Sequence, residues 1–453
     1  MSIFGPSAKA HVVGVGGAGM SGLALLLVEM GVEVSGSDAI GSPVLDELRR
    51  AGVDVRLGHD VTFASDADVV VWSPAISDNN PELQAARERG ATMLNRAKVL
   101  SELSKLQPVI GLTGTHGKTT ATSMMVQVLH AAGRDDSRLL GARVTGVGAN
   151  GHWGSGSLVL EVDESYGTFS LLAPYALGVL NVEADHLDYY GTLDVLEDAF
   201  ARLMARTTGP VVVWSDDPGV RRVTHLSRRD VVFVGTSDDV TWRVSDIALT
   251  REGASFTLRG PQQDVKLELS VTGNHNVANA AVVAALALNL GVGVSAVGGG
   301  LKAFVGAPRR FQLLGRWRGV DVYEDYAHLP GEIMATLASA RSIGYEKITA
   351  VFQPHRVTRT QNLAALFADA FVDAATVIVT DVYTAGEENP EGVTGEIIAS
   401  VVRVQEGATC SYAATFHDVL DLLEEHLDAS DVILLLGAGD IASVAALLPG
   451  GLS

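Results

Sequence analysis

The amino-acid sequence predicts an α/β protein of three domains, each built around a mostly parallel sheet. Apolar strand-like runs and helix-like segments alternate along the whole chain, which is the pattern of parallel sheets covered by helices. The length of 453 residues exceeds a single hydrophobic core and suggests about three domains of roughly 150 residues. Two glycine-rich turns each follow a strand-like run and precede a helix-like one, as phosphate-binding loops of α/β proteins do.

Changes in pattern divide the chain into the expected domains 1–107, 108–307 and 308–453. Between residues 241 and 270, short alternating segments predict a small antiparallel insertion in the second domain. The other strands are expected at residues 10–16, 32–38, 68–75, 109–114, 158–162, 177–182, 210–214, 320–325, 347–353, 375–381 and 431–439.

Composition limits the classes of function open to this chain. Its hydrophobic content of 47% and charged content of 19% are typical of a folded globular protein. The formal net charge of −20 repels polyphosphate backbones, so we expect no nucleic-acid partner. An anionic nucleotide must therefore be bound by local basic side chains and backbone N–H groups.

Cysteine usage and hydropathy predict a cytoplasmic location. Cys410 is the single cysteine, so neither an internal disulfide nor a thiolate metal site is expected. The uncharged, apolar stretch at residues 10–28 contains five glycines and fits a strand, a turn and a helix better than a membrane span. We expect no membrane insertion.

The first glycine turn has the spacing of a dinucleotide-binding loop. Gly14, Gly16 and Gly19 form a GxGxxG between a strand and a helix, and Asp38 ends the next strand. Taken alone, this pattern fits a Rossmann-like domain that binds NAD, with Asp38 on a ribose. A turn that binds nothing is the other interpretation, and the loop does not distinguish NAD from a UDP-sugar.

The second glycine turn, "GLTGTHGKTT", is the most specific signal in the chain. Gly117, Lys118 and Thr119 follow a strand and open a helix, so backbone N–H groups and the lysine would hold phosphates while the threonine hydroxyl meets Mg²⁺. The general form of this loop needs glycine where Leu112 stands, so the loop is a variant, unless the GKT is a chance occurrence. A second nucleotide loop is poorly explained by hydride transfer, which disfavours a dehydrogenase.

Acidic residues at two later strand ends are candidate Mg²⁺ ligands. Glu161 ends one strand, and a second strand is followed by Glu183, Asp185 and His186. Ligands bind at the carboxyl ends of parallel strands, and Mg²⁺ prefers oxygen ligands. For any one of these acids, a solvated loop position is the alternative.

Basic and aromatic residues follow the strands of the third domain. Arg356 and Arg359 are three residues apart, so on a helical turn they would share a face and clamp a carboxylate or phosphate, unless they are an exposed basic pair. Other polar candidates are Asn276 at a helix start, Arg310 near the domain junction, and Asp325, Tyr326, His328 and His355.

Taken together, these segments resemble the Mur ligase family over essentially the whole chain. The resemblance runs in order through "GVGGAGMSG", "VSGSD", "GTHGKTT", "NVEADHLDYYG", "GNHNVANA", "RRF", "DYAH", "FQPHR" and "GAGDI". Within the family it is closest to the ligases that join L-alanine to UDP-N-acetylmuramate. The resemblance implies three domains, the last of them Rossmann-like, that bind the UDP-sugar, ATP with Mg²⁺, and the amino acid in turn, as a monomer or homodimer.

The resemblance also implies roles for individual residues. It implies UDP-sugar binding by Gly16, Gly17, Ala18, Gly19 and Asp38. It implies ATP binding by Gly114, Thr115, His116, Gly117, Lys118, Thr119, Thr120, Asn276, Arg310 and Asp325. It implies Mg²⁺ ligands at Thr119, Glu161 and His186, and amino-acid binding by Tyr326, His328, His355, Arg356 and Arg359. Lys118, His186, His328 and Arg356 are the expected catalytic residues.

Three positions depart from the family pattern. Tyr166 replaces the last aspartate of "DESD", Leu329 replaces a second histidine after His328, and Val357 replaces the tyrosine of "FQPHRY". Two of them adjoin the expected amino-acid pocket, so a ligase that adds a preformed peptide to the same sugar is an alternative. A non-catalytic UDP-sugar-binding regulator is another.

Overall fold

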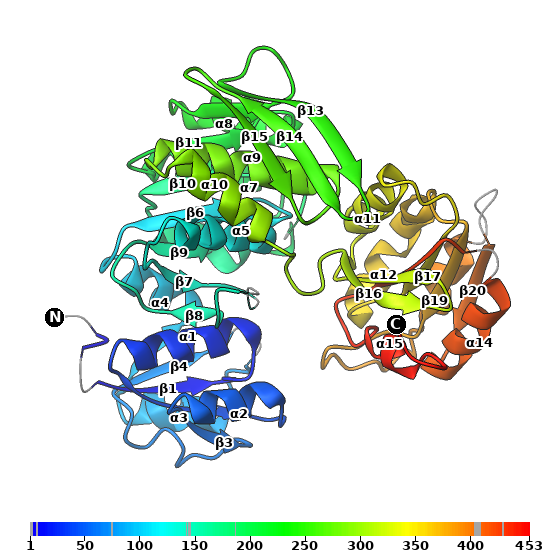
Figure 1. Cartoon of the computed structure of the whole chain (residues 1–453). Helices are drawn as coiled ribbons and strands as arrows, with labels where there is room; N and C mark the ends of the chain where they lie inside the picture. Colours follow the sequence, from blue (N-terminus) through cyan, green and yellow to red (C-terminus); the bar gives the residue numbers. More distant parts are fainter. Residues whose placement is uncertain are drawn as a thin grey trace. The chain divides into compact units, whose positions relative to one another are not determined.

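The computed structural model contains three sheets of five, ten and six strands. It describes residues 3–5, 8–73, 76–141, 143, 146–185, 187–402, 409–427 and 430–453. The sheets follow one another along the chain, as the colours of Figure 1 show. The five- and ten-stranded sheets lie in one compact unit, and residues 306–453 form a second with two short segments, Leu249–Gly253 and Thr272–His275.

The five-stranded sheet is parallel throughout, in the order β3-β2-β1-β4-β5. Its strands are β1 (Lys9–Val13), β2 (Glu33–Asp38), β3 (Asp54–Leu57), β4 (Val69–Trp72) and β5 (Thr92–Asn95). The helices are α1 (Ala18–Glu29), α2 (Pro43–Arg50), α3 (Pro81–Glu88) and α4 (Arg96–Leu103). Successive side chains of β1 enter separate cores because a strand alternates its faces: Val12 packs with α1 residues and Val13 with α3 residues.

The ten-stranded sheet has the order β15-β14-β13-β12-β11-β10-β6-β9-β7-β8. Its strands are β6 (Val109–Thr113), β7 (Ser137–Leu139), β8 (Gly151–His152), β9 (Leu158–Glu161), β10 (Ala176–Val179), β11 (Val211–Trp214), β12 (Val232–Gly235), β13 (Trp242–Thr250), β14 (Gly253–Arg259) and β15 (Asp264–Leu269). Its helices are α5 (Lys118–Ala131), η1 (Ser165–Leu171), α6 (Leu187–Tyr190), α7 (Leu193–Arg206), α8 (Pro218–Ser227), α9 (Asn274–Asn289) and α10 (Val294–Ala303). The expected antiparallel insertion is present as β14 and β15, but β13 pairs in parallel with β12, so these strands extend the main sheet.

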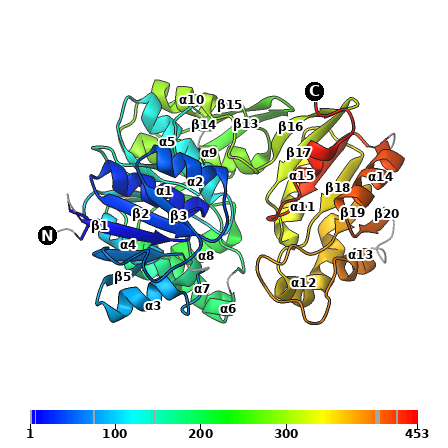
Figure 2. The ribbon, with the colours of Figure 1, turned by 90° about the horizontal axis from the view of Figure 1, so that it is seen from below.

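The six-stranded sheet has the order β16-β17-β21-β18-β19-β20 and is parallel except for the β16–β17 pair. Its strands are β16 (Gln312–Trp317), β17 (Val320–Asp325), β18 (Ile348–Phe352), β19 (Thr376–Thr380), β20 (Thr409–Ala413) and β21 (Val432–Leu436). Its helices are α11 (Pro330–Ser342), α12 (Val357–Leu363), η2 (Ala364–Phe371), α13 (Glu396–Val402), α14 (Phe416–His426) and α15 (Ser443–Leu447). Residues of α11, η2 and α13 fill one core and residues of α14 and α15 fill another, so helices cover both faces (Figure 2).

The fold confirms the predicted three-domain α/β class. Among the described helices, none combines the length and the apolar character needed to cross a membrane.

Candidate active site

The phosphate loop joins β6 to α5, as the sequence predicts. Gly117 is the residue before α5 and has φ +80°, a conformation that favours glycine. A Cβ at Gly117 would lie 2.8 Å from Oδ1 of Asn279 on α9, and a Cβ at Gly114 would lie 3.1 Å from the backbone N and O of Asn181. Glycine at position 114 therefore leaves room for the Asn181 backbone, and glycine at position 117 permits the positive φ and leaves room for the Asn279 side chain.

The ammonium of Lys118 has all of its donors engaged by protein groups. It donates to the carbonyls of Gly114 (2.7 Å) and Thr115 (3.1 Å) and to both oxygens of Glu164 (3.0 and 2.9 Å). The side chains of Lys118 and Glu164 are 14% and 1% exposed. Burial opposes the lysine charge, yet the neighbouring carboxylates, Glu164 foremost, hold the pKa of Lys118 above its usual value. Lys118 is therefore a largely buried cation at the first residue of α5, directly after the loop.

Hydrogen bonds to the segment that follows β10 fix the other loop residues. The His116 N–H donates to Asn181 Oδ1 at 2.7 Å, and the Thr115 hydroxyl accepts from the Glu183 N–H at 2.8 Å. Thr120 is buried in the first turn of α5. These bonds attach the loop to the next strand end of the sheet.

Thr119 and Glu161 meet, as expected for a Mg²⁺ site. The Thr119 hydroxyl donates to Glu161 Oε2 at 2.9 Å, and the Gly141 N–H donates to the other carboxylate oxygen at 2.6 Å. A hydroxyl and a carboxylate at the N-terminus of α5 are oxygen donors of the kind that Mg²⁺ prefers. The third expected ligand, His186, lies outside the described residues. Within the described part, no group of three His, Cys, Asp or Glu side chains is placed to hold a metal.

The first glycine loop is held by the residues that end β2. The N–H groups of Gly14 and Val15 donate to the Ser37 carbonyl at 2.8 and 3.0 Å, and the Gly16 N–H donates to Asp38 Oδ2 at 2.8 Å. Helix α1 begins at Ala18, with Gly17 as its N-cap. Asp38 therefore shapes the loop directly, which the sequence pattern does not show.

The buried carboxylate of Glu82 is linked to the first glycine loop through Ser37. Glu82 accepts from His11 Nε2 at 2.6 Å, from the Ser37 hydroxyl at 2.8 Å and from His59 Nδ1 at 2.7 Å. The hydrogen bonds from these partners outweigh its burial, so the pKa of Glu82 is lowered and the carboxylate is ionised. Ser37 links this network to the Gly14 turn.

The two glycine loops belong to the same compact unit, and a hollow lies beside the first of them. The Asn150 side chain donates to the Ala18 carbonyl at 2.7 Å, and this bond links the residue before β8 to the start of α1. The hollow is lined by Ala18 and Ser21 of α1, by Val44 and Glu47 of α2, and by Gly141 and Asn150. It therefore leads from the start of α1 to the residue whose N–H binds Glu161.

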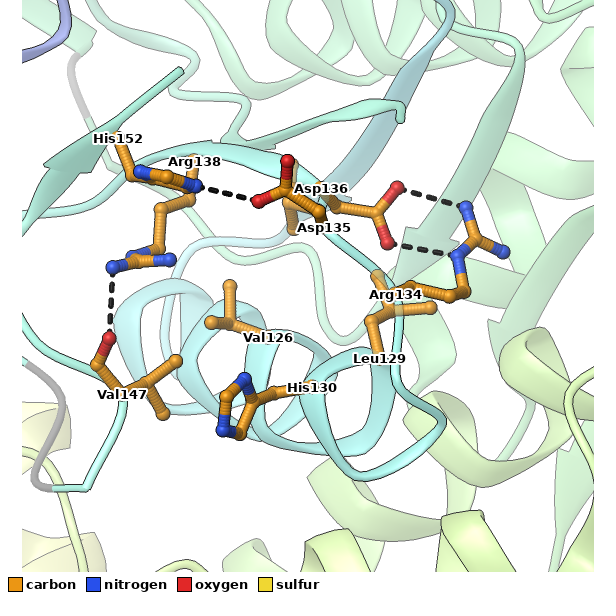
Figure 3. Close-up of a pocket in the computed structure, with 10 residues that line it drawn as sticks. Val126, Leu129, His130, Arg134, Asp135, Asp136, Arg138, Val147 and His152 are labelled. Carbon is orange, nitrogen blue, oxygen red and sulfur yellow. Dashed lines mark hydrogen bonds and ion pairs between the residues drawn. The ribbon is translucent and has the colours of Figure 1, made fainter. Parts of the chain in front are cut away.

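A second hollow lies at the opposite end of α5, where Figure 3 shows its lining. The nearest residue of α5 that lines it, Val126, is eight residues from Lys118, which is roughly 12 Å at 1.5 Å per residue. Among its charged side chains, Arg134 pairs with Asp136 and His152 with Asp135, both at 2.8 Å, while Arg138 donates to the carbonyls of Ala149 and Val147. This hollow is therefore separate from the Lys118 loop.

In the second unit, four aromatic rings from the expected amino-acid pocket and its surroundings form a chain. Tyr326 contacts His328 edge-on, and His328 contacts His355, with ring centroids 5.3 and 5.6 Å apart. His355 stacks on Tyr383 at 5.6 Å, and the guanidinium of Arg310 lies 4.9 Å from the Tyr326 ring. The structure thus brings together residues that follow three different strands.

The arginine pair does not share a helical face, because α12 begins at Val357. Arg356 precedes the helix with φ +73° and lies 3.7 Å from a carboxylate oxygen of Glu387, and Arg359 lies 3.3 Å from His355 Nδ1. Glu387 also accepts from the Thr358 N–H at 3.0 Å. The expectation of a shared face is wrong, since the strained turn directs each arginine to its own partner.

Asp325 is buried at the end of β17, where its oxygens accept from the N–H groups of Phe311 (2.6 Å) and Ala327 (2.8 Å). Burial raises the pKa of Asp325 to about 6. The Arg309 side chain donates to the carbonyls of Gly437 and Gly439 at 2.9 and 2.8 Å. These two side chains position the loops around Arg310.

The remaining expected residues fall as follows. Asn276 is buried in the first turn of α9, in the first unit. Leu329 is the N-cap of α11, and Val357 is buried at the start of α12. The side chain of Tyr166 lies outside the described part of the chain.

Known proteins share this arrangement from end to end. Profiles of the Mur ligase family match the catalytic domain at residues 9–107, the middle domain at 112–287 and the glutamate ligase domain at 309–439. The UDP-N-acetylmuramate–L-alanine ligase of Nitratidesulfovibrio vulgaris (strain DP4) is 39% identical over 440 residues, 96% of each chain. The chain belongs to the Mur ligase family. Members of this family are ATP-dependent ligases that form amide bonds, and this chain is an enzyme of that class.

Further Mur ligases agree in sequence and in fold. The UDP-N-acetylmuramate–L-alanine ligase of Thermobifida fusca (strain YX) is 39% identical over 451 residues, covering 96% of this chain and 95% of that protein. The crystal structure of the UDP-N-acetylmuramate-alanine ligase of Thermotoga maritima has a TM-score of 0.81 at 30% identity and covers 97% of this chain and 98% of its own. A murein peptide ligase of Psychrobacter arcticus shares the fold, with a TM-score of 0.73 at 23% identity over 98% of both chains.

Sequence reasoning missed several contacts of this Mur ligase. Glu164 pairs with Lys118, although its place in "DES" suggested at most a metal ligand. Tyr383 and Glu387 lie on the loop after β19, where "VYTAGEE" follows an apolar strand. A search for polar and aromatic residues after every predicted strand would have found both.

Proposed function

We propose that this ligase joins L-alanine to the lactyl carboxylate of UDP-N-acetylmuramate, with conversion of ATP to ADP and phosphate. One observation carries the proposal: the two glycine loops lie in one compact unit, and a hollow runs from the start of α1 to Gly141, whose N–H binds the Glu161 carboxylate that pairs with Thr119. A nucleotide-sugar in the first loop can therefore extend its acid toward ATP in the second. The names of the similar ligases supply the identity of the sugar and of the amino acid.

The proposed residue assignments are those that the family resemblance implies. Residues 1–107 bind the UDP-sugar through Gly16–Gly19 and Asp38, and residues 108–307 bind ATP through residues 114–120 and Asn276. Residues 308–453 bind the amino acid and, through Arg310 and Asp325, contribute to the ATP site. A cytoplasmic location and a monomeric or homodimeric state stay predictions.

The first chemical step is phosphoryl transfer. A carboxylate does not react with an amine at neutral pH, because oxide is too poor a leaving group. One oxygen of the sugar carboxylate attacks the γ-phosphorus of ATP, the bond to the β–γ bridging oxygen breaks, and ADP leaves. Lys118 stabilises the charge on the phosphates. Thr119, Glu161 and His186 would hold Mg²⁺, which supplies further positive charge there.

The second step forms the amide. The amine nitrogen attacks the carbonyl carbon of the acyl phosphate, and phosphate leaves. The amine must first lose a proton, and His328 is suited to accept it. Its Nδ1 faces two acceptors, the Tyr326 carbonyl at 3.0 Å and Glu332 at 3.2 Å, so Nδ1 carries the hydrogen and Nε2 has the free lone pair. Burial lowers the pKa of His328, which keeps the ring neutral at neutral pH.

The carboxylate of the amino acid requires cations. Arg356 and Arg359 both follow His355 in the sequence, and Arg359 lies 3.3 Å from Nδ1 of His355, a member of the aromatic chain that starts at Tyr326. A guanidinium matches a carboxylate in geometry and charge. Leu329 and Val357 stand beside these groups in the sequence, and they keep a peptide-adding ligase as the second candidate.

A single incubation tests the proposal. Purified protein with ATP, UDP-N-acetylmuramate, L-alanine, glycine, serine and a tripeptide is analysed by mass spectrometry. We expect mainly the L-alanyl product, with phosphate release that requires the sugar. A peptidyl product would favour the peptide-adding ligase, and phosphate release indifferent to the sugar would overturn the proposal. Loss of product in Lys118→Met, with UDP-sugar binding retained, would exclude a non-catalytic regulator.

A further inference from the structure

Arg96 is a basic side chain beside the first glycine loop to which neither the motifs nor the fold assigns a role. It is the first residue of α4, directly after β5, and so lies at the carboxyl edge of the five-stranded sheet. That edge is where α/β sheets bind their ligands. The dipole of α4 disfavours a cation at this position, so helix stability does not explain the arginine.

The guanidinium of Arg96 lies against Gly19 in the first turn of α1. A Cβ at Gly19 would be 3.0 Å from Nε, 3.2 Å from Cζ and 3.3 Å from Nη2 of Arg96. The N–H groups of Ala18 and Gly19 have no partner inside their own helix, because the first turn of any helix lacks them. A planar cation and free N–H groups therefore meet at one helix N-terminus.

Arg96 Nε is buried and has no hydrogen-bond partner among the described residues. A buried donor left unpaired is costly, so this one is expected to gain an acceptor when a ligand binds. Several other basic side chains of residues 1–107 are already engaged by protein oxygens. They are Lys9 with Asp66, Arg49 with Asp46, Arg56 with Asp54, Arg87 with Asp78, Arg89 with the Ala64 carbonyl, and Lys105 with Glu102.

Charge gives the reason why such a group is needed. The chain carries a formal net charge of −20, and the loop itself places the Asp38 carboxylate 2.8 Å from the Gly16 N–H. A diphosphate must enter this negative field, and a local cation offsets it.

We propose that Arg96 is a binding residue for the diphosphate of the nucleotide-sugar, and that glycine at position 19 leaves room for its guanidinium beside the start of α1. The proposal rests on the proposed function, since it takes the first loop as the UDP-sugar site. It extends that function by a residue that acts through the substrate's phosphates and not through its base or its sugar.

The test compares Arg96→Gln with wild type by calorimetric titration of UDP and of uridine. We expect UDP to bind about 10- to 100-fold more weakly, which is the loss of one charge-assisted hydrogen bond to a phosphate, with uridine binding unchanged. In steady-state assays, the KM for UDP-N-acetylmuramate rises while the KM for ATP stays the same. The matched control is Lys98→Gln, which removes an exposed cation two residues along the same helix and should change neither quantity.

The outcomes separate the two claims. If wild type binds UDP and Arg96→Gln binds it equally well, the role of Arg96 is refuted and the proposed function stands. If wild type does not bind UDP at all, the proposed function itself fails. Should Arg96→Gln not fold, Arg96→Lys decides: weaker UDP binding supports the proposal, because an ammonium cannot reproduce the planar contact, and unchanged binding overturns it.

Discussion

Replacing Glu164 by glutamine should strengthen the binding of nucleotide in the absence of Mg²⁺. An ammonium has three donors, and those of Lys118 are all occupied by Gly114, Thr115 and Glu164. The γ-phosphate must therefore displace one of these groups, and the displaced carboxylate of Glu164 would be left buried beside a phosphate. In the ligand-free protein, Glu164 binds the lysine ammonium, so ATP must compete with Glu164 when it binds.

The magnitude follows from the pair itself. A charge-assisted hydrogen bond contributes about 1.5–3 kcal/mol, and about 1.4 kcal/mol corresponds to a factor of ten. Because Glu164 is 1% exposed and Lys118 14%, solvent screens this pair little. We expect Glu164→Gln to bind ADP and ATP about 10- to 100-fold more tightly without Mg²⁺, and to lower the thermal midpoint of the ligand-free protein.

Isothermal titration in EDTA measures the effect. Glu183→Gln is the matched control, because it removes a carboxylate near the same loop that is 55% exposed and 3.5 Å from His116. Its nucleotide affinity should change less than about threefold, as expected for a screened charge. Equal or weaker binding by Glu164→Gln would refute the competition and would mean that Glu164 supports the bound state.

Two further predictions concern stability. Gly151→Ala places a Cβ 1.7 Å from the Gly22 carbonyl, so the packing of β8 on α1 must shift, and urea unfolding should show a loss of about 1–3 kcal/mol. Gly299→Ala, in a helix with nothing within 4 Å, is the control and should be neutral or stabilising. His355 has a pKa lowered to about 4 by burial and then by nearby positive groups. The unfolded chain therefore binds more protons between pH 6.5 and about 4, stability falls as pH falls through that window, and a pH series on His355→Gln should show a shallower loss. An identical slope for the two proteins would contradict the role of His355.

Local patterns predicted much of this fold correctly. The helices that begin at Ala18 and Lys118 start directly after the glycine turns, as the sequence predicts. This prediction succeeds because the strand, the turn and the helix are neighbours in the sequence. Short edge strands were not predicted. Strands β7, β8 and β16 are brief or lie at sheet margins, and their pairing depends on partners distant in the sequence.

In the candidate site too, some features could be predicted from the sequence and others only from the tertiary structure. The sequence by itself determined which residue types are present and where each lies relative to a strand end, and this was enough for the two loops and for the pairing of Thr119 with Glu161. The tertiary structure alone decided that Lys118 pairs with Glu164, that Arg356 departs from the helix, and that Arg96 lies against Gly19. Motifs are local because backbone geometry is local, whereas the partner of a charged side chain depends on which elements the packing of the core brings together.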